Sequence, residues 1–352
     1  MTRTTRYGTR GRRDRRAPLV LAGSAPQHES GPRRDRDWAP RRVAILAHYA
    51  PSAAPGRSVA TMLTELSECG LDTVLVSAAP QAVGPLERSG TAAGSTLPAD
   101  TTILRRPNLG HDFGTWAAAL AAFPHLARAD EVILLNDSML GPFAPMAPVL
   151  RALADGSDPV RGLIRSEQHR PHLQTFLILY RGGVLAEPAL RRFWGDRRVE
   201  RSKAKTVRFG ELALAETLDA AGIGWSAQFD PAPGDTANPT LSHWADLLGP
   251  GFPLLKRSLL DPATGPGPTR LAEVLRHDFG TELDEWVDPA QVALAQAWGA
   301  NSPSQPPGRG LAAVPSGLAT ALAIEGPTGL LRRASGRLST RARRHRAARA
   351  GG

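Results

Sequence analysis

Two short, continuously apolar runs separated by one helical stretch constrain most strongly what this chain can fold into. The first covers residues 43–47, and the second is Val74-Leu75-Val76 within the strand expected at residues 73–77. Continuous apolar character is typical of strands that are buried on both faces. Between them, apolar side chains recur at helical spacing over residues 59–69, and Gly70 follows as a helix-ending residue. A strand, a helix and a second strand in this order predict two parallel strands of one sheet.

The same alternation continues along the chain and predicts a doubly wound α/β domain with a mostly parallel sheet. Further strands are expected at residues 102–105, 131–135, 162–164, 175–180 and 225–229. Helices are expected at residues 115–126, 183–194, 209–221 and 271–279. We place the domain at residues 39–262 and expect a helical C-terminal extension at residues 263–331.

The net charge of +10 is unevenly distributed over the 352 residues. Residues 1–38 hold ten arginines and four acids, and residues 326–352 hold eight arginines and no acid, so the segment between them carries −4. Both ends are poor in apolar residues, which predicts disordered basic tails at residues 1–38 and 332–352. A mildly acidic body argues against a specific nucleic-acid-binding domain, whose basic face would belong to the fold itself.

Cysteine content and hydropathy exclude several further classes of protein. The single cysteine, Cys69, excludes an intramolecular disulfide framework and a cysteine-rich metal site. No apolar run reaches the roughly 20 residues that a membrane-spanning helix needs. We therefore expect a protein that is soluble or attached peripherally to a membrane.

Polar clusters follow three of the predicted strands, at the edge where open parallel sheets bind ligands. They are formed by His48 and Tyr49, by Asn108, Gly110 and Asp112, and by Asn136, Asp137 and Ser138. A carboxylate that ends a buried strand can hold a divalent cation, Mg²⁺ or Mn²⁺, which neutralises a diphosphate. Asp137 is the candidate for this role, and capping of the turn that follows is its alternative.

Four blocks in the same order resemble the rhamnan synthesis F family. They are Pro-Asn-Leu-Gly-His-Asp-Phe-Gly-Thr-Trp at residues 107–116, Leu-Leu-Asn-Asp-Ser-Met-Leu-Gly-Pro at residues 134–142, His-Leu-Gln-Thr-Phe at residues 172–176, and a closing block with Asn-Pro-Thr at residues 238–240, Trp244 and Phe-Pro-Leu-Leu-Lys at residues 252–256. Together they span about residues 43–260 with the first strand, which makes the resemblance more specific than any one motif.

The resemblance implies a GT-A-like glycosyltransferase that moves rhamnose or a related sugar, with inversion. Its donor would be a nucleotide-diphosphate sugar such as dTDP-rhamnose, and its acceptor a cell-surface polysaccharide or lipid-linked glycan. By this likeness Asp137 takes the place of the acid that faces the metal or the diphosphate. Asn136-Asp137-Ser138 holds one carboxylate where an Asp-x-Asp motif holds two, so dependence on a metal stays open.

The matching blocks also supply candidate donor-binding residues, each with a structural alternative. Asn108, Gly110 and Asp112 either contact the nucleotide or sugar or form an Asx turn that holds their loop. His172 and Gln174 either bind a sugar hydroxyl or diphosphate or make structural hydrogen bonds. Four further residues either contact the donor or have only a local structural role, namely His48, Asn136, Ser138 and Lys256. For Lys256 the alternative is a solvated surface lysine.

Inversion at an anomeric carbon requires a base that takes the proton of the acceptor hydroxyl. Glu211, near the start of a predicted helix, is our candidate, because the family shows a similarly placed glutamate. The alternative is a first-turn glutamate that is favoured by the helix dipole.

Two other functions remain open from the sequence. A catalytically silent relative would scaffold a polysaccharide assembly complex, and a nucleic-acid-associated protein would act through its arginine tails. The resemblance implies a cytoplasmic protein whose lipid-linked acceptors lie at the inner face of the plasma membrane, and the tails suit that anionic surface. The alternative for the tails is an arginine-rich extension without function.

The pentapeptide His-Asp-Phe-Gly-Thr occurs at residues 111–115 and again at residues 277–281. The second copy follows a predicted helix, where Gly280 suits the C-cap. Because nothing around the two copies matches, we interpret the repeat as coincidence.

Overall fold

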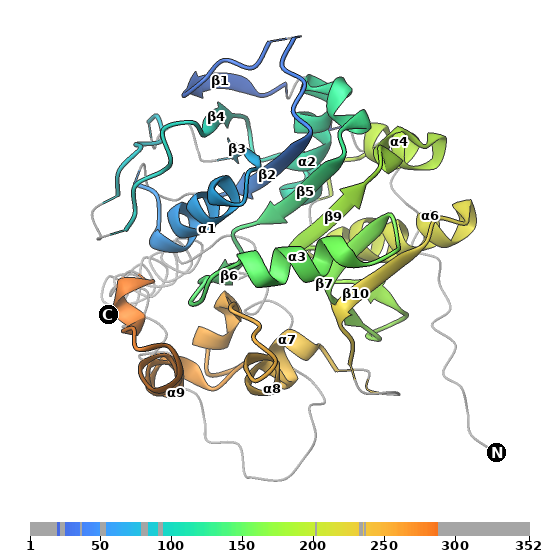
Figure 1. Ribbon diagram of the computed structural model, residues 1–352. Helices are drawn as coiled ribbons and strands as arrows, with labels where there is room; N and C mark the ends of the chain where they lie inside the picture. Colours follow the sequence, from blue (N-terminus) through green and yellow to red (C-terminus); the bar gives the residue numbers. More distant parts are fainter. Residues whose placement is uncertain are drawn as a thin grey trace, which may run out of the picture.

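The computed structural model describes residues 20–21 and 25–287, apart from positions 36, 50–53, 79–83, 91–93, 201–202, 232–234 and 236. Strands and helices alternate along this part of the chain (Figure 1). The strands are β1 (Gln27–Ser30), β2 (Arg42–His48), β3 (Asp72–Ser77), β4 (Thr102–Arg105), β5 (Glu131–Asn136), β6 (Met139–Leu140), β7 (Val160–Ser166), β8 (His172–Leu173), β9 (Leu177–Arg181), β10 (Trp225–Phe229) and β11 (Leu255–Lys256).

The α-helices are α1 (Arg57–Glu68), α2 (His111–Ala122), α3 (Ala147–Asp155), α4 (Pro188–Gly195), α5 (Lys203–Thr206), α6 (Ala213–Ala221), α7 (Pro239–Ser242), α8 (Trp244–Leu248) and α9 (Gly267–Val274). The 3₁₀ segments are η2 (Pro124–Arg128), η3 (Val184–Ala186), η5 (Arg257–Leu260) and η7 (Leu283–Glu285). Two π-helical segments, η4 (Val207–Leu212) and η6 (Leu275–Phe279), continue neighbouring helices.

The described residues form a nine-stranded sheet in the order β1-β4-β3-β2-β5-β9-β7-β10, with β8 paired to β7. β4, β3, β2 and β5 pair in parallel, and β7 and β10 run in the same direction. β9 is antiparallel to both β5 and β7, and β1 is antiparallel to β4. This large, mostly parallel sheet confirms the predicted α/β class.

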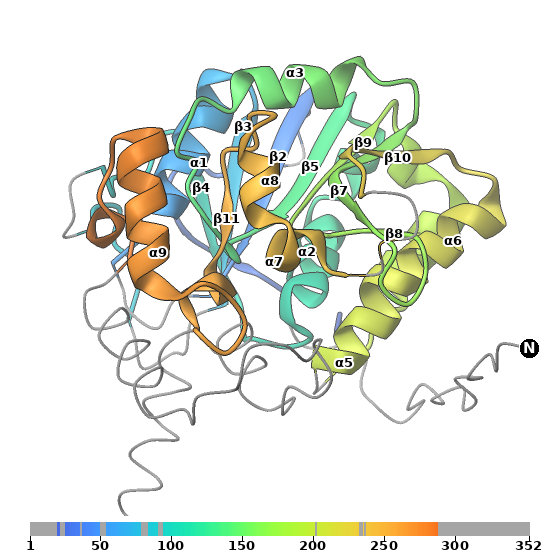
Figure 2. The same ribbon diagram turned by 90° about the horizontal axis from the view of Figure 1, so that it is seen from below.

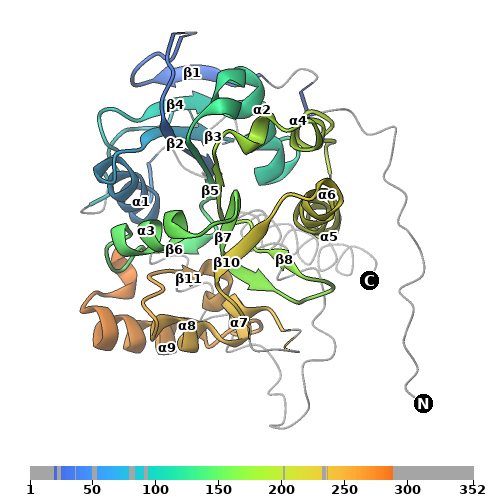
Figure 3. The same cartoon turned by 45° about the vertical axis from the view of Figure 1, so that its right-hand side comes forward.

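Helices cover both faces of the sheet, because successive side chains of a strand point to opposite sides. Along β2, Ala44 and Leu46 belong to the apolar core with α1 and α3, whereas Val43 and Ile45 belong to the core with α2, α4 and α6. Figure 3 shows these two helical layers on either side of the sheet. Burial on both faces is why the strands appear in the sequence as continuous apolar runs.

A third apolar cluster lies at the carboxyl ends of the parallel strands. β6 follows β5 and pairs antiparallel with β11, which brings the last described segment back to this edge. Leu140 of β6 packs with Leu255, Leu259 and Leu271. Figure 2 views the molecule from this side, with α7, α8 and α9 in front of the sheet. None of the helices in the described residues is long and apolar enough to cross a membrane.

Two of the predicted domain boundaries are wrong. Gln27–Ser30 is an edge strand of the sheet and Val20 is fully buried, so the predicted disordered tail at residues 1–38 includes ordered structure. Leu271, in the predicted extension, packs against Leu140, so the domain does not end at residue 262. Residues 1–19, the extension beyond residue 287 and the tail at residues 332–352 lie outside the described residues.

The predicted elements agree with the structure in order and differ at their ends. The strands predicted at residues 102–105 and 225–229 match β4 and β10. The helix predicted at residues 115–126 starts earlier, at His111. The helix predicted at residues 209–221 is the later part of a helical stretch that begins at Lys203, and the one at residues 183–194 is divided into η3 and α4.

Candidate functional site

His48 and Asp137 form a close pair at the carboxyl edge of the sheet. β2 and β5 are neighbouring parallel strands, so the residues at their ends meet. His48 Nδ1 donates a hydrogen bond to Asp137 Oδ2 at 2.7 Å, and the Tyr49 amide donates to the same oxygen at 2.9 Å. His48 is buried, whereas the Asp137 side chain is 22% exposed. One carboxylate oxygen of Asp137 is therefore engaged by the protein itself.

The surroundings of Asp137 favour its ionised form. Burial would raise the pKa of its carboxyl group, but the hydrogen bond from His48, the charges of His48 and Arg257 and the Tyr49 amide together lower the pKa below its ordinary value. Arg257 Nε also donates to the main-chain oxygen of Asp137 at 2.8 Å. A charged acid held among basic side chains is typical of a functional site, although structural ion pairs produce the same effect.

Asn136 connects the end of β5 to α2. Its Nδ2 donates to Asp112 Oδ2 at 2.7 Å, and its Oδ1 accepts from the amide and the hydroxyl of Ser138 at 3.1 and 2.7 Å. The side chains of Asn136 and Ser138 therefore fix the turn, while Asp137 accepts from the end of β2 and does not cap the turn that follows. The structure thus brings Asp112, Asn136 and Asp137 to one edge.

The start of α2 depends on two glycines and a buried arginine. Gly110 has a left-handed backbone with φ 80°, and a Cβ atom at Gly114 would lie 2.0 Å from the Leu109 carbonyl oxygen. Arg106 donates to that same carbonyl at 3.0 Å and to Thr115 Oγ1 at 2.9 Å. Burial lowers the pKa of Arg106 to about 10, which leaves it charged at neutral pH. These contacts hold the turn that presents Asp112.

Glu211 lies in the π-helical segment η4, inside the helical stretch that runs from α5 to α6. Its Oε1 accepts from Thr175 Oγ1 at 3.2 Å, and its Oε2 lies 3.7 Å from His172 Nε2. The Glu211 side chain is 22% exposed, so the carboxylate is anchored yet reachable. It is not a first-turn glutamate, because the helical stretch begins well before it, at Lys203. π-helical turns are frequent at functional sites.

The protonation of His172 is fixed on one side by the main chain. His172 Nδ1 lies 2.8 Å from the Arg170 main-chain oxygen, and since a carbonyl oxygen only accepts, Nδ1 carries a proton. In the neutral ring, Nε2 then turns a lone pair toward Glu211. His172 Nε2 therefore faces the Glu211 carboxylate at 3.7 Å.

Glu211 is connected to the end of β5 through the segment that leads into β9. Thr175 donates to Glu211, and the next residue, Phe176, accepts a hydrogen bond from the Asn136 amide at 3.1 Å. Thr175 is buried, which fixes the position of its hydroxyl. Glu211 and Asn136 are thus connected through two consecutive buried residues, Thr175 and Phe176.

A second connection joins Glu211 to α2. Gly210, which precedes Glu211, packs so closely on Phe113 that a Cβ atom there would lie 2.6 Å from the ring. Phe113 follows Asp112, whose carboxylate accepts from Asn136. The two connections together gather Asp112, Asn136 and Glu211 at one place on the sheet edge.

A comparison with known protein families matches the part of the chain that holds most of this site. Residues 90–283 match the profile of a family described as rhamnan synthesis protein F, which is more than half of the chain. The chain belongs to the rhamnan synthesis protein F family. The match includes every candidate residue above except His48. No curated protein matches the chain.

Of the other candidates that the family resemblance supplied, Gln174 has a structural role. Its Nε2 donates to Asn238 Oδ1 at 2.7 Å, and its Oε1 accepts from Thr240 Oγ1 at 3.0 Å. Gln174 is buried, and both ends of its amide are used. These hydrogen bonds fasten the start of α7 to the sheet, as the structural alternative expects, and donor binding by Gln174 stays a prediction.

Lys256 lies beside the strand-end turn, and Asn108 lies near the start of α2. Lys256 is half-buried in β11, opposite Met139 of β6, and Asn108 is exposed on the loop before α2. Their roles in donor binding stay predictions. Sequence reasoning missed Arg257, the residue after Lys256, which contacts Asp137. The only available signal was the placement of two consecutive basic residues at the end of the closing block.

The donor set around Asp137 does not fit a divalent cation site built by the protein. The described residues contain no group of three or more His, Cys, Asp or Glu side chains that could hold a metal ion. Oδ2 of Asp137 already accepts two hydrogen bonds, and the amide of Asn136 is taken up by Asp112 and Ser138. Dependence on Mg²⁺ or Mn²⁺ stays a prediction.

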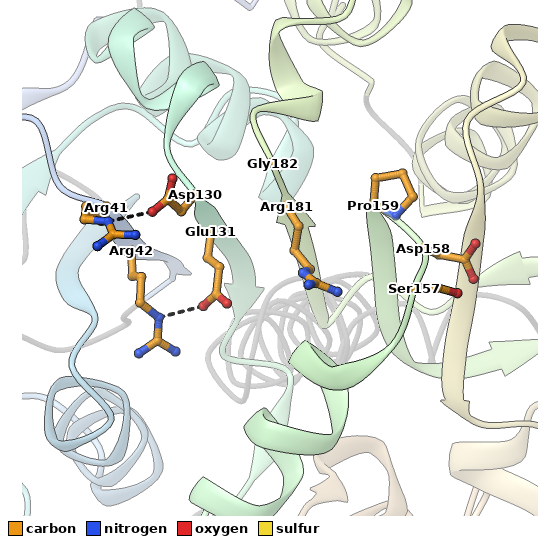
Figure 4. A pocket seen from close by; sticks show the side chains of 9 residues that line it. All are labelled: Arg41, Arg42, Asp130, Glu131, Ser157, Asp158, Pro159, Arg181 and Gly182. Carbon is orange, nitrogen blue, oxygen red and sulfur yellow. Dashed lines mark hydrogen bonds and ion pairs between the residues drawn. The ribbon is translucent and has the colours of Figure 1, made fainter.

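A pocket on the opposite edge of the sheet is separate from this site (Figure 4). It lies where β2, β5 and β7 begin. Four of its charged side chains form two ion pairs, Arg41 with Asp130 and Arg42 with Glu131, both at 2.7 Å. Because these four charges neutralise one another, we assign no chemistry to this pocket.

Proposed function

We propose that this member of the rhamnan synthesis protein F family is a glycosyltransferase that transfers rhamnose or a related hexose. The donor is a nucleoside-diphosphate sugar such as dTDP-rhamnose, and the acceptor is a cell-surface polysaccharide or its lipid-linked precursor. The observation that carries the proposal is the gathering of Asp112, Asn136, Asp137 and Glu211 at the carboxyl edge of a mostly parallel sheet in a chain of this family. The order of parallel strands followed by antiparallel β9 supports assignment to the GT-A-like folds.

In the proposed reaction Glu211 is the general base. An acceptor hydroxyl gives its proton to the Glu211 carboxylate while its oxygen bonds to the anomeric carbon of the donor. The bond between that carbon and the phosphate oxygen breaks, and the nucleoside diphosphate leaves with the electron pair. Attack from the face opposite the leaving group inverts the anomeric centre. His172 Nε2, 3.7 Å from Glu211, is placed to share the proton that Glu211 has taken.

The test measures release of nucleoside diphosphate from dTDP-rhamnose and from UDP- and GDP-sugars by the purified chain. Glu211→Gln should lower turnover by roughly 10²–10⁴, as expected for loss of a general base, with donor binding little changed. If the Asp137 side chain faces the diphosphate or a metal that comes with it, Asp137→Ala should abolish transfer in a protein that still folds. Glu216→Gln is the matched control, because Glu216 lies on the same helical stretch but is exposed and paired with Arg170.

Different outcomes separate the alternatives. Loss of donor affinity at unchanged turnover in Glu211→Gln would make Glu211 a binding residue. If the wild-type chain consumes no donor, with or without added polysaccharide, the scaffold function takes the place of the transferase. Failure of Asp137→Ala to fold would return Asp137 to a structural role.

We also propose that the protein works at the cytoplasmic leaflet, drawn there by its arginine-rich ends. Residues 332–352 carry eight arginines and no acid, and each basic residue near an anionic surface contributes about 1 kcal/mol. Removing this segment should weaken sedimentation with phosphatidylserine vesicles and lower activity on a lipid-linked acceptor, but not on a short soluble one. Equal sedimentation of the two proteins at low and moderate salt would dispose of this idea.

A further inference from the structure

Arg257 lies against the turn that follows β5, beside Asp137. It follows β11, whose antiparallel pairing with β6 aligns Lys256 with Met139. This register returns the chain to the end of β5. The Arg257 amide donates to the Ser138 carbonyl at 3.0 Å, and Arg257 Nε donates to the Asp137 carbonyl at 2.8 Å. Two hydrogen bonds to main-chain oxygens, one from its amide and one from its side chain, therefore hold the arginine against the strand-end turn.

The charge of Arg257 is available to a ligand. Its hydrogen bond goes to a main-chain oxygen, while the Asp137 carboxylate is turned toward His48 and the Tyr49 amide. Within the described part of the chain, Nε is the only side-chain atom of Arg257 with a hydrogen-bond partner. The residue is half-buried, and burial lowers the pKa of its guanidinium while the Asp137 charge opposes that change.

A diphosphate leaving group needs positive charge as its bond to the sugar breaks. The protein offers no divalent cation site at this edge within its described residues, but it does offer a guanidinium whose two terminal amino groups remain for a ligand. Guanidinium binds phosphate oxygens in bidentate fashion and keeps its charge when partly desolvated. The buried His48 beside Asp137 adds a second basic group to the same location.

We propose that Arg257, and not a divalent cation, neutralises the diphosphate of the donor. The inference rests on the proposed function, because it assumes a nucleoside-diphosphate donor. Arg257 binds the phosphate oxygens in the ground state and holds the negative charge that the leaving oxygen acquires when the anomeric carbon–oxygen bond breaks. Asp137 and Ser138 act through their main-chain oxygens to position it.

The experiment measures binding of dTDP, UDP and GDP, and of the matching monophosphates, to the full chain by calorimetry in EDTA and in Mg²⁺. Wild-type affinity for the preferred diphosphate should be the same in both buffers. Arg257→Gln should weaken diphosphate binding about 10- to 100-fold, the range for one charge-assisted contact, and change monophosphate binding much less. Arg257→Lys should recover part of the loss and provides a second variant if Arg257→Gln does not fold.

Two comparison variants sharpen the test. Arg41→Gln removes an arginine from the opposite edge of the sheet (Figure 4) and should leave binding unchanged. Lys256→Gln tests the rival cation, and a larger loss there than in Arg257→Gln overturns the proposal. Diphosphate binding that requires Mg²⁺ overturns it as well, while leaving the transferase proposal intact. If the wild-type chain binds no nucleoside diphosphate, the proposed function and this inference both fail.

Discussion

The same five residues, His-Asp-Phe-Gly-Thr, have opposite roles at residues 111–115 and at residues 277–281. The first copy opens α2 at the carboxyl edge of the sheet, where Asp112 accepts from Asn136. The second copy closes the helical stretch of α9 and η6, and its His277 and Asp278 pair with each other at 2.6 Å on the surface. The difference shows that distant contacts, and not local sequence, decide which copy takes part in the site.

Each position of the pentapeptide therefore provides a matched pair of substitutions. At each of the three inner positions, the two copies have the same residue with the same neighbour on either side. The same substitution can therefore be made in both copies. They differ in what surrounds the side chain, so the difference between two matched variants measures tertiary context alone.

The largest difference is expected at the phenylalanines. Phe113 is 5% exposed and its ring lies 5.3 Å from that of Trp116 and 5.8 Å from that of Trp194. Phe113→Ala should lower the free energy of unfolding by about 3–5 kcal/mol. Phe279 is half-buried against Phe143, so Phe279→Ala should cost roughly 1–2 kcal/mol, because less apolar surface is lost. Urea unfolding measures the free energy of unfolding of both variants. Equal losses would show that the two environments stabilise the phenylalanine ring alike.

The glycines should differ next. At Gly114 an added Cβ atom would meet the Leu109 carbonyl oxygen at 2.0 Å, and main chain cannot move aside as a flexible side chain can. We expect Gly114→Ala to cost about 3 kcal/mol or more, since overpacking costs typically 1–3 kcal/mol and here the contact is backbone. Gly280 has φ 64° and open space around it, so Gly280→Ala should cost roughly 1–2 kcal/mol. The urea midpoints of the two variants should differ accordingly.

The sequence predicted most strands of the large sheet because their pattern is local. The continuous apolar run of β2 reports burial on both faces, and the bounds of β4 and of the edge strand β10 were predicted to the residue. β1 was missed because Gln27–Ser30 is polar and lies in an arginine-rich segment. Its assignment depends on pairing with β4, far along the chain, which composition does not report. The antiparallel direction of β9 is non-local in the same way.

The candidate site was predicted in part for the same reason. Residues at strand ends, such as His48 and Asp137, could be grouped because strand order follows from the βαβ pattern. The choice of Lys256 over Arg257 could not be made from sequence, because β11 has two residues and no periodicity. Its register with β6 decides which residue returns to Asp137. The structural hydrogen bonds of Gln174 could not be assigned from sequence, because its partners, Asn238 and Thr240, are more than sixty residues away.

The aspartates of the two copies should differ in activity. Asp112→Ala removes the acceptor of the Asn136 Nδ2 hydrogen bond, which frees the amide that fixes the turn bearing Asp137. An unsatisfied donor costs about 1–3 kcal/mol, so transfer should fall about 10- to 100-fold if that energy is lost from the transition state. Asp278→Ala disturbs only an exposed pair and should stay within twofold. Initial rates at saturating donor test this, and equal rates would remove Asp112 from the site.

The smallest effect compares two His–Asp pairs of similar length, the buried His48–Asp137 at 2.7 Å and the exposed His277–Asp278 at 2.6 Å. The pKa of Asp137 is lowered in the folded protein, so its charge stabilises the fold above the pKa of the unfolded carboxyl group, about 3.9. That stabilisation is lost as pH falls through the lower, folded pKa. Asp137→Asn should therefore cost roughly 1–2 kcal/mol at pH 7. The cost should begin to shrink below about pH 4, because the unfolded wild-type chain then binds a proton that the folded carboxylate does not yet bind. Asp278→Asn should cost less than about 0.5 kcal/mol at either pH, since exposed ion pairs contribute little.

Urea unfolding of the wild type and the two variants between pH 7 and pH 3.5 provides the comparison. A cost of Asp137→Asn that does not depend on pH would show that its hydrogen bonds, and not its charge, stabilise the fold.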